Sequence, residues 1–499
     1  MKKSYLSTSS EWTFELIQRY EIEIGKIARK YELDTYPTQI EVITSEQMID
    51  AYSAVGMPLG YHHWSYGKQF LEVEQEYLLG HMGLAYEIVI NSNPCIAYLL
   101  EENTMMMQAL VLAHACYGHN SFFKSNYLFT TWTNPNSIID YLLFAKNYIS
   151  DCEEKYGLSA VEETIDACHA LMNYGVDRYK HPPRLSIRVE KLRQKEREDY
   201  LQSQVNELWR TLPKRDLMQK NNNPECFPAE PQENILYFIE KNAPLLESWQ
   251  REIVRIVRKI AQYFYPQRQT KLMNEGWATF WHYVILNDLF EARLVNEQFM
   301  LEFLQTHTNV IAQTGYDNPY FNGLNPYALG YRMFGDIRRI CEQPTEEDKE
   351  WFPDIANSNW IRTIDFSMRN FKDESFIAQF LSPKLIRDLK LFSIVDDDLN
   401  NDLVISAIHD QEGYQKIREA LSNQFNLSSN EPNIQIYSVD HRGDRSLTLR
   451  HIQHNRRPLY ESDVKDVMKH LYKLWGFKVK LETETDEGDV KLLYQYPSD

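Results

Sequence analysis

The chain has 499 residues, 43% of them hydrophobic, and a formal net charge of −18 at pH 7. This hydrophobic fraction excludes a disordered chain, and the length exceeds what one hydrophobic core usually holds, so we expect two or three folded domains. The acidic balance disfavours nucleic acid as a partner, because an acidic surface repels phosphate groups.

The cysteine and apolar patterns bear on the cellular compartment. The six cysteines include no CxxC pair, which argues against a disulfide framework and against a four-cysteine zinc site. The lysines at positions 2 and 3 are not followed by an apolar segment, so we expect no signal peptide. No uninterrupted apolar run reaches about 18 residues, so we expect no membrane span and a cytoplasmic protein with reduced thiols.

The first 180 residues predict helices interrupted by extended segments. Ser10 is a candidate N-cap for a helix over residues 11–31, and residues 36–44, "YPTQIEVIT", look extended. β-Branched residues on both sides of the turn sequence "NSNP" predict a hairpin or an extended edge over residues 84–103. A long apolar helix follows, and two more helices are expected between residues 135 and 180.

Composition changes twice in the rest of the chain. Residues 181–232 combine a charged helical pattern with a segment rich in proline and asparagine, which predicts an insertion ending in a surface loop. Helical patterns then run to about residue 388, and from there strands alternate with two helices. The sequence therefore predicts an α+β fold, with a mainly helical domain at residues 1–388 and a small α/β domain at residues 389–499.

The stretch "QALVLAHACYGHNSFF", residues 108–123, carries two histidines on an apolar helix. His114 and His119 are five residues apart, which places them about 140° apart on a regular α-helix. A π-bulge would bring both imidazoles to one face, and Gly118 makes such a distortion easier. Ala115 stands where the HExxH motif of zinc hydrolases has its catalytic glutamate, so any general base must come from another segment.

A second stretch, "NEGWATFWH" at residues 274–282, offers a carboxylate and another imidazole. Glu275 is the candidate third metal ligand. His282 lies two turns, about 10 Å, further along and is expected behind the ligands or in the wall of the site. His63, on a loop flanked by glycine and proline, is a candidate additional ligand. Each residue also has a structural interpretation, as a hydrogen-bonded core histidine, as half of a buried ion pair, or as a loop-packing residue.

Five motifs spread over nearly the whole chain resemble the stage V sporulation protein R (SpoVR) family: "MPLGYHHWSYGKQF", "LAYEIVINSNPCIAYLLEENT", "AHACYGHNSFFKSNYLF", "MNEGWATFWHY" and "NPYALGYRMFGDI". The resemblance implies a link to spore cortex formation or, in bacteria that do not sporulate, to stationary phase and stress. It also implies a PrkA-like serine kinase and a von Willebrand-type protein as partners. Many members carry HxxGH, whereas this sequence has "HACYGH", so the family motif transfers more directly to His119 than to His114.

A more distant likeness to gluzincin metallopeptidases implies a zincin-like domain over residues 1–388. One hypothesis is therefore a metalloprotein with zinc, or iron or manganese, on His114, His119 and Glu275, with His63 and His282 as an additional site. Its reaction would be metal-dependent hydrolysis of an amide in a peptide or a peptidoglycan-derived substrate. The alternative is a catalytically degenerate, metal-binding regulator or adaptor that acts with the kinase and the von Willebrand-type protein. The sequence leaves open whether the protein is an enzyme.

Overall fold

The computed structural model describes residues 5–7, 9–53, 60–78, 87–180, 227–228, 230–315, 318, 321, 323–396, 403–407, 409–454, 457–485 and 488–497. The chain forms two compact units, one made of Met1–Glu163 with Ile260–Glu431 and the other of Thr164–Lys259 with Pro432–Asp499. Most of the predicted insertion at residues 181–232 lies outside the described residues. The boundary at 388/389 stays a prediction; residues 389–431 group with the first unit.

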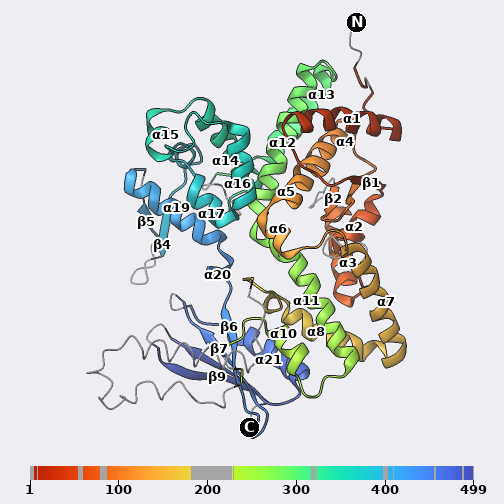
Figure 1. Cartoon of the computed structure of the whole chain (residues 1–499), viewed down its shortest axis with the longest axis vertical. Helices are drawn as coiled ribbons and strands as arrows, with labels where there is room; N and C mark the ends of the chain where they lie inside the picture. Colours follow the sequence, from red (N-terminus) through yellow and green to blue (C-terminus); the bar gives the residue numbers. More distant parts are fainter. Residues whose placement is uncertain are drawn as a thin grey trace, which may run out of the picture. The chain divides into compact units, whose positions relative to one another are not determined.

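Helices dominate the first unit, and two small sheets complete it (Figure 1). Its elements are α1 (Phe14–Lys30), β1 (Thr38–Ile43), α2 (Ser45–Ser53), α3 (Trp64–Leu78), β2 (Glu87–Ile90), β3 (Cys95–Leu100), α4 (Met105–Val111), the π-helix η1 (Leu112–His119), α5 (Asn120–Ser125), α6 (Tyr127–Trp132), α7 (Ile138–Tyr156), α12 (Lys271–Glu291), α13 (Glu297–Val310), α14 (Pro326–Glu342), α15 (Glu346–Trp351), α16 (Trp360–Asn370), α17 (Asp373–Phe380), α18 (Pro383–Asp388), β4 (Ser393–Asp396), β5 (Leu403–Ala407), α19 (Gln411–Phe425) and α20 (Leu427–Asn430).

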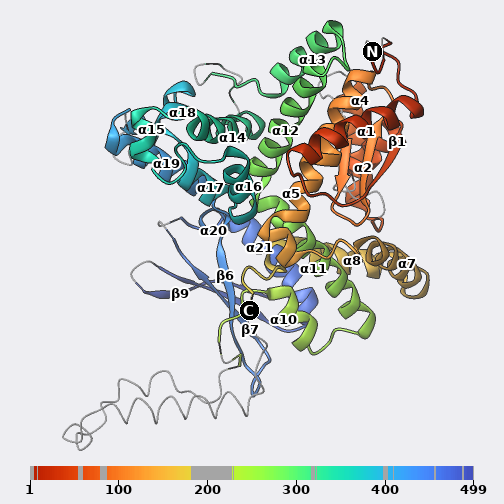
Figure 2. The same cartoon turned by 45° about the horizontal axis from the view of Figure 1, so that its top comes forward.

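Helix α12 is the centre of this unit. Its apolar residues point in every direction and are buried, as expected for a helix surrounded by others. It packs against η1 on one side and α14 on another, and Figure 2 shows α14 and α12 side by side. Gly276 and Gly330 make the second contact possible, because a Cβ on Gly276 would lie 2.4 Å from the Gly330 carbonyl carbon. Aromatic side chains join the aliphatic core around α12, with Trp277 and Trp281 almost completely buried.

The N-terminus of α12 is held by an acid from another helix. The Asp373 carboxylate accepts hydrogen bonds from the backbone N–H groups of Leu272 and Met273, both at 2.9 Å. These groups would otherwise lack an intrahelical acceptor, and a carboxylate also suits the positive end of a helix dipole. Burial raises the pKa of Asp373 to about 7, although these backbone hydrogen bonds oppose the rise. The contact fixes the start of α12, and two residues of the site described below lie in its first two turns.

The predicted hairpin is confirmed as β2 and β3, which pair antiparallel, and β1 adds to β3 in parallel. The strand order is β1-β3-β2, so β2 is an edge of this sheet. Side chains alternate between the two faces of a strand. Ile88 and Ile90 pack into a small apolar cluster, whereas Val89 packs against the main core. Glu87, two residues before Val89, therefore projects towards the main core and η1.

The second unit contains a four-stranded sheet of order β6-β7-β8-β9. All four strands and the long helix between β7 and β8 match the sequence prediction, as do β4, β5 and α19 of the first unit. The elements of the second unit are η2 (Met172–Tyr174), α10 (Ile235–Asn242), β6 (Asn433–Val439), β7 (Leu447–Ile452), α21 (Glu461–Trp475), β8 (Val479–Glu484) and β9 (Val490–Tyr496). Helices α8 (Leu158–Ala170) and α11 (Ser248–Gln269) contribute residues to both units.

The mostly helical architecture with small sheets confirms the predicted α+β class. Among the described residues, no helix is both long and apolar enough to cross a membrane.

Candidate functional site

The two histidines of the apolar helix share one face because the helix between them is a π-helix. Residues Leu112–His119 form η1, which continues directly from α4 and into α5. In a π-helix the backbone hydrogen bond joins residues five apart, so His114 and His119 stand one turn apart. Their ring centroids are 4.6 Å apart and the rings are nearly perpendicular. The irregular helix that the two-histidine site requires is therefore present.

Gly118 lets this irregular helix lie directly against α12. A Cβ at position 118 would be 2.6 Å from the Cα of Ala278, closer than real Cβ atoms come to backbone. The glycine thus has a packing role as well as a conformational one. The close approach brings the imidazoles of η1 to the side chains of the first turns of α12.

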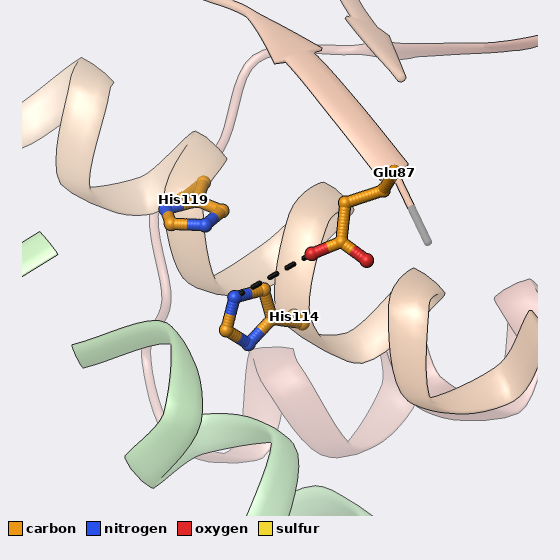
Figure 3. A group of neighbouring side chains, drawn as sticks. All are labelled: Glu87, His114 and His119. Atoms are coloured by element: carbon orange, nitrogen blue, oxygen red, sulfur yellow. Dashed lines mark ion pairs between the residues drawn. The ribbon is translucent and has the colours of Figure 1, made fainter. Parts of the chain in front are cut away.

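Three elements supply the acids and imidazoles of the site. Figure 3 shows Glu87 reaching from β2 towards His114 on η1, with Glu87 Oε1 3.5 Å from His114 Nε2. From α12, Glu275 Oε2 lies 3.8 Å from His114 Nε2 and 3.6 Å from His119 Nε2. Glu87, His114 and His119 form the group of described residues whose ligand atoms all lie within 4.8 Å of one another. The structure thus brings together the three predicted ligands and adds one acid.

The hydrogen bonds of His119 fix which of its nitrogens is available. His119 Nδ1 is 2.9 Å from Asn274 Oδ1, an amide oxygen that can only accept, so Nδ1 carries the proton. His119 Nε2 therefore presents a lone pair towards Glu275 Oε2, which is buried and has no hydrogen-bond partner among the described residues. Two acceptors that face each other repel unless a cation lies between them. The cluster has the donor set and the spacing to hold a metal ion.

Burial and neighbouring charges act against each other in this cluster, and the charges prevail at two groups: the pKa of Glu275 is lowered, and that of His114 is raised by Glu87 and Glu275 although burial lowers it. Burial raises the pKa of Glu87 to about 7, opposed by His114 and reinforced by Glu275. Burial opposes ionisation of Glu275 as well, but the imidazoles of His119 and His114 hold the pKa of its carboxyl below the ordinary value. Burial lowers the pKa of His119 to about 4, so this imidazole is neutral near pH 7. One ionised carboxylate, one acid that titrates near neutrality and a neutral imidazole therefore share the site.

A cavity of about 610 Å³ opens at this cluster. Both glutamates and three histidines line it with apolar side chains and a few neutral polar groups, and no lysine or arginine occurs among the described residues of its wall. The lining residues are Glu87, Val89, Leu110, His114, His119, Phe123, Gln267, Asn274, Glu275, His282, Val310, Asn325 and Tyr327. Its size and mixed lining are those of a small-molecule or peptide site.

Comparison with known proteins agrees with the motifs. The family model described as "SpoVR like protein" matches residues 11–430, and the one described as "SpoVR-like C-terminal domain" matches residues 432–486. The chain belongs to the SpoVR family. It is 64% identical over 492 residues to "Uncharacterized protein YcgB" of Escherichia coli (strain K12), covering 99% of this chain and 96% of that protein. No solved structure matches the chain.

Family membership adds no chemistry to the site by itself. The relative named above comes from a bacterium that does not sporulate, so membership alone assigns no sporulation role to this chain. The chemistry of the SpoVR site depends on the side chains that the fold brings together there.

The remaining predicted residues fall in two places. His282 lies behind His114, with the two Nδ1 atoms 3.0 Å apart, as expected for a residue outside the ligand set. His63 Nδ1 lies 2.7 Å from the hydroxyl of Ser65, and its ring contacts Trp64 and Tyr66. His63 is not part of the close group formed by Glu87, His114 and His119.

Four residues of this SpoVR site are not among those predicted from the sequence. Glu87 is the one acid in the apolar strand "EIVI", and Asn274 precedes the predicted ligand Glu275, so both had a local signal. Tyr327, in the first turn of α14, lines the cavity and donates a hydrogen bond that helps to lower the pKa of Glu275. His307, on α13, has its Nδ1 2.9 Å from His282 Nε2. Tyr327 lies in the family motif "NPYALGYRMFGDI" but was given no role there, and His307 had no local signal.

The pH dependence of stability should separate two of these groups in the metal-free protein. Burial raises the pKa of Glu87 from 4.5 to about 7, so its contribution is present below pH 4.5 and lost as the pH rises through 7. Burial lowers the pKa of His307 from 6.5 to about 4, so its contribution is present above pH 6.5 and lost as the pH falls through 4.

We therefore expect metal-free Glu87→Gln to lose less stability than the wild type between pH 5 and pH 8. Metal-free His307→Leu should lose less than the wild type between pH 6.5 and pH 4. Thermal unfolding midpoints measured in a chelator across this range test both. If the midpoints of both variants run parallel to that of the wild type at every pH, neither group has a different pKa in the folded and unfolded states.

Proposed function

We propose that this SpoVR protein is a zincin-like, metal-dependent hydrolase of amide bonds, with a divalent cation held by His114, His119 and Glu275. The observation that carries the proposal is the Nε2 lone pair of His119 facing a buried Glu275 oxygen without a hydrogen bond, 3.6 Å away. For metal–ligand distances of about 2.1 Å, tetrahedral ligands stand about 3.4 Å apart, close to the separations in this cluster. Two imidazoles and a carboxylate suit zinc, and iron or manganese would accept the same donors.

The surrounding residues have the chemistry that hydrolysis requires. A bound divalent cation would lower the pKa of a water molecule and polarise a carbonyl. Glu87 Oε1 lies 3.5 Å from His114 Nε2, and the pKa of Glu87, about 7, suits a general base near neutral pH. Tyr327 lines the cavity and donates its hydroxyl to Glu275, which favours the ionised carboxylate that a cation would need as a ligand. Glu87 would then take the role of the catalytic glutamate of HExxH, whose position Ala115 occupies in this sequence.

A peptide-like substrate is favoured by the strand that supplies Glu87. Strand β2 is an edge of its sheet, and an extended peptide can add to such an edge through main-chain hydrogen bonds. Val89, on the same face of β2 as Glu87, lines the cavity. A chain lying along β2 would therefore run past the cluster. A peptidoglycan-derived amide, a role in cortex formation or stress, and partnership with a PrkA-like kinase and a von Willebrand-type protein stay predictions of the family resemblance.

Metal analysis tests the proposal directly. Protein purified without added metal, and again after incubation with zinc and gel filtration, should hold close to one ion per chain. His119→Ala and Glu275→Ala should hold almost none, because each removes a ligand. His454→Ala, which changes an exposed histidine of the second unit, serves as the matched control and should load like the wild type. Equal and near-zero metal in the wild type and all variants after zinc loading would contradict the proposal.

A further inference from the structure

We infer that His282 and His307 are positioning residues, which fix the tautomer of His114 through a buried chain of imidazoles so that His114 Nε2 presents its lone pair to the cation. This inference rests on the proposed function and adds to it two residues that do not touch the ion.

The line of three imidazoles is continuous and buried. His114 Nδ1 lies 3.0 Å from His282 Nδ1, and His282 Nε2 lies 2.9 Å from His307 Nδ1. His282 and His307 are 1% and 3% exposed. Each link joins one nitrogen that donates to one that accepts. Three residues from η1, α12 and α13 therefore form one hydrogen-bonded line that leads away from the cluster.

The two hydrogen bonds between the three imidazoles must run in the same direction. His282 and His307 are almost completely buried, and burial disfavours a charged imidazole, so both rings are neutral and each has a single N–H. If His307 carries its proton on Nε2, its Nδ1 accepts from His282 Nε2–H. His282 Nδ1 must then accept from His114 Nδ1–H, so a neutral His114, the form that binds a cation, has its lone pair on Nε2. The opposite direction would place a proton on His114 Nε2, where it would block a cation.

The surroundings of His307 select the first direction. His307 Nε2 is buried and has no hydrogen-bond partner among the described residues. The rings of Tyr331, Tyr283 and Phe303 surround the imidazole, with centroids 4.9, 4.9 and 5.7 Å from it, and the Tyr331 ring is nearly perpendicular to it. The faces of aromatic rings are electron-rich, so they attract an N–H and repel a lone pair. The aromatic surroundings therefore favour the Nε2–H tautomer of His307.

This arrangement does for His114 what Asn274 does for His119. In both cases the Nδ1–H has an acceptor and Nε2 is left for the ion, as is usual for histidines that bind metals. The difference is that one acceptor beside His114 is itself an imidazole, whose tautomer must be fixed by the next residue, and the backbone carbonyl of Ala278 is a second acceptor for His114. His307 is therefore predicted to matter for metal binding although it lies two hydrogen bonds from the nearest ligand.

Three variants of the full chain separate this role from simple core packing. His282→Phe keeps a ring of similar size but offers no acceptor to His114. His307→Leu removes the group that accepts from His282, whereas His307→Asn places a side-chain oxygen near the position of Nδ1 and can still accept. Zinc affinity is measured by competition with a chelator, and the absorption spectrum of the cobalt-substituted protein reports the ligand geometry. Thermal unfolding of the metal-free variants monitors packing.

We expect zinc affinity to fall about 10- to 100-fold in His282→Phe and about 10-fold in His307→Leu, with altered cobalt spectra. His307→Asn should stay within about threefold of the wild type, even if it unfolds at a lower temperature. In ¹⁵N NMR spectra of histidine-labelled, metal-free protein, the His307 signal, assigned by its loss in His307→Asn, should be that of the Nε2–H tautomer.

Two results would overturn the inference and leave the proposed metal site intact. In the first, the wild type binds one zinc per chain, and His307→Leu and His307→Asn have the same zinc affinity as each other. In the second, the ¹⁵N signal of His307 is that of the Nδ1–H tautomer. A wild type that binds no zinc at all would instead remove the proposed function, and the inference with it.

Discussion

Gly330→Ala is expected to lower the free energy of unfolding by about 3 kcal/mol, one of the largest effects that adding a single methyl group could have in this protein. A Cβ at position 330 would lie 2.3 Å from the carbonyl oxygen of Leu272 and 2.7 Å from the Cα of Gly276. Both are backbone atoms of α12, so neither can move by rotating a side chain. The two helices would have to separate, and the aromatic core between them would lose contacts along its length.

The same helix offers a matched control. Gly335 lies one to two turns further along α14, and a Cβ there would meet no atom within 4 Å. Gly335→Ala should therefore be neutral or stabilising by up to about 1 kcal/mol, because alanine has the higher helix propensity. Chemical denaturation of the two variants and the wild type measures the difference. Equal losses in both variants would show that the contact between α12 and α14 is looser than the structure indicates.

The contact between these helices also matters for the site. Glu275 immediately precedes Gly276 on α12, and Tyr327 lies one turn before Gly330 on α14. The glycine pair therefore sets the distance between the candidate ligand and the hydroxyl that hydrogen-bonds to it. On the other side of α12, Gly118 sets the distance to the two histidines of η1. Positions without a side chain thus determine how the functional side chains meet.

Local patterns in the sequence predicted most elements that the structure describes. The "NSNP" turn between β-branched runs predicted β2 and β3, and the alternation of strands and helices after residue 389 predicted β4 to β9. Even the π-helix could be anticipated, because two histidines five residues apart next to Gly118 can serve one site only if the helix is irregular. These predictions succeeded because each depends on residues that are neighbours in sequence.

Contacts between distant segments could not be predicted in the same way. Glu87 reaches His114 only because the β2–β3 hairpin places its edge beside η1, and nothing near residue 87 indicates that packing. His282 was expected behind the ligands, but its partner His307 lies on another helix, 25 residues away. The grouping of residues 389–431 with the first unit likewise depends on tertiary contacts. The candidate ligands His114, His119 and Glu275 could be predicted from the sequence, whereas only the fold shows that Glu87 lies beside them.

Glu87→Gln is expected to keep the metal ion and to lower the rate of amide hydrolysis by about 10²- to 10⁴-fold, if Glu87 is the general base. Glutamine has nearly the same shape but cannot accept a proton from water. In the wild type the rate should rise with pH until Glu87 is ionised, at or below pH 7, because a bound cation lowers the pKa of a neighbouring acid. This rise should be absent in Glu87→Gln.

Metal content decides between the two roles open to Glu87. As a base it is not needed to hold the ion, so Glu87→Gln should contain as much zinc as the wild type and as Glu102→Gln, which changes an exposed glutamate after β3. As a fourth ligand it would be needed, and the variant would lose zinc together with any activity. Turnover of a fluorogenic peptide library by zinc-loaded protein supplies the rates. Zinc retention with wild-type rates would exclude Glu87 from the chemistry and leave the acceptor of the water proton to another residue of the cavity.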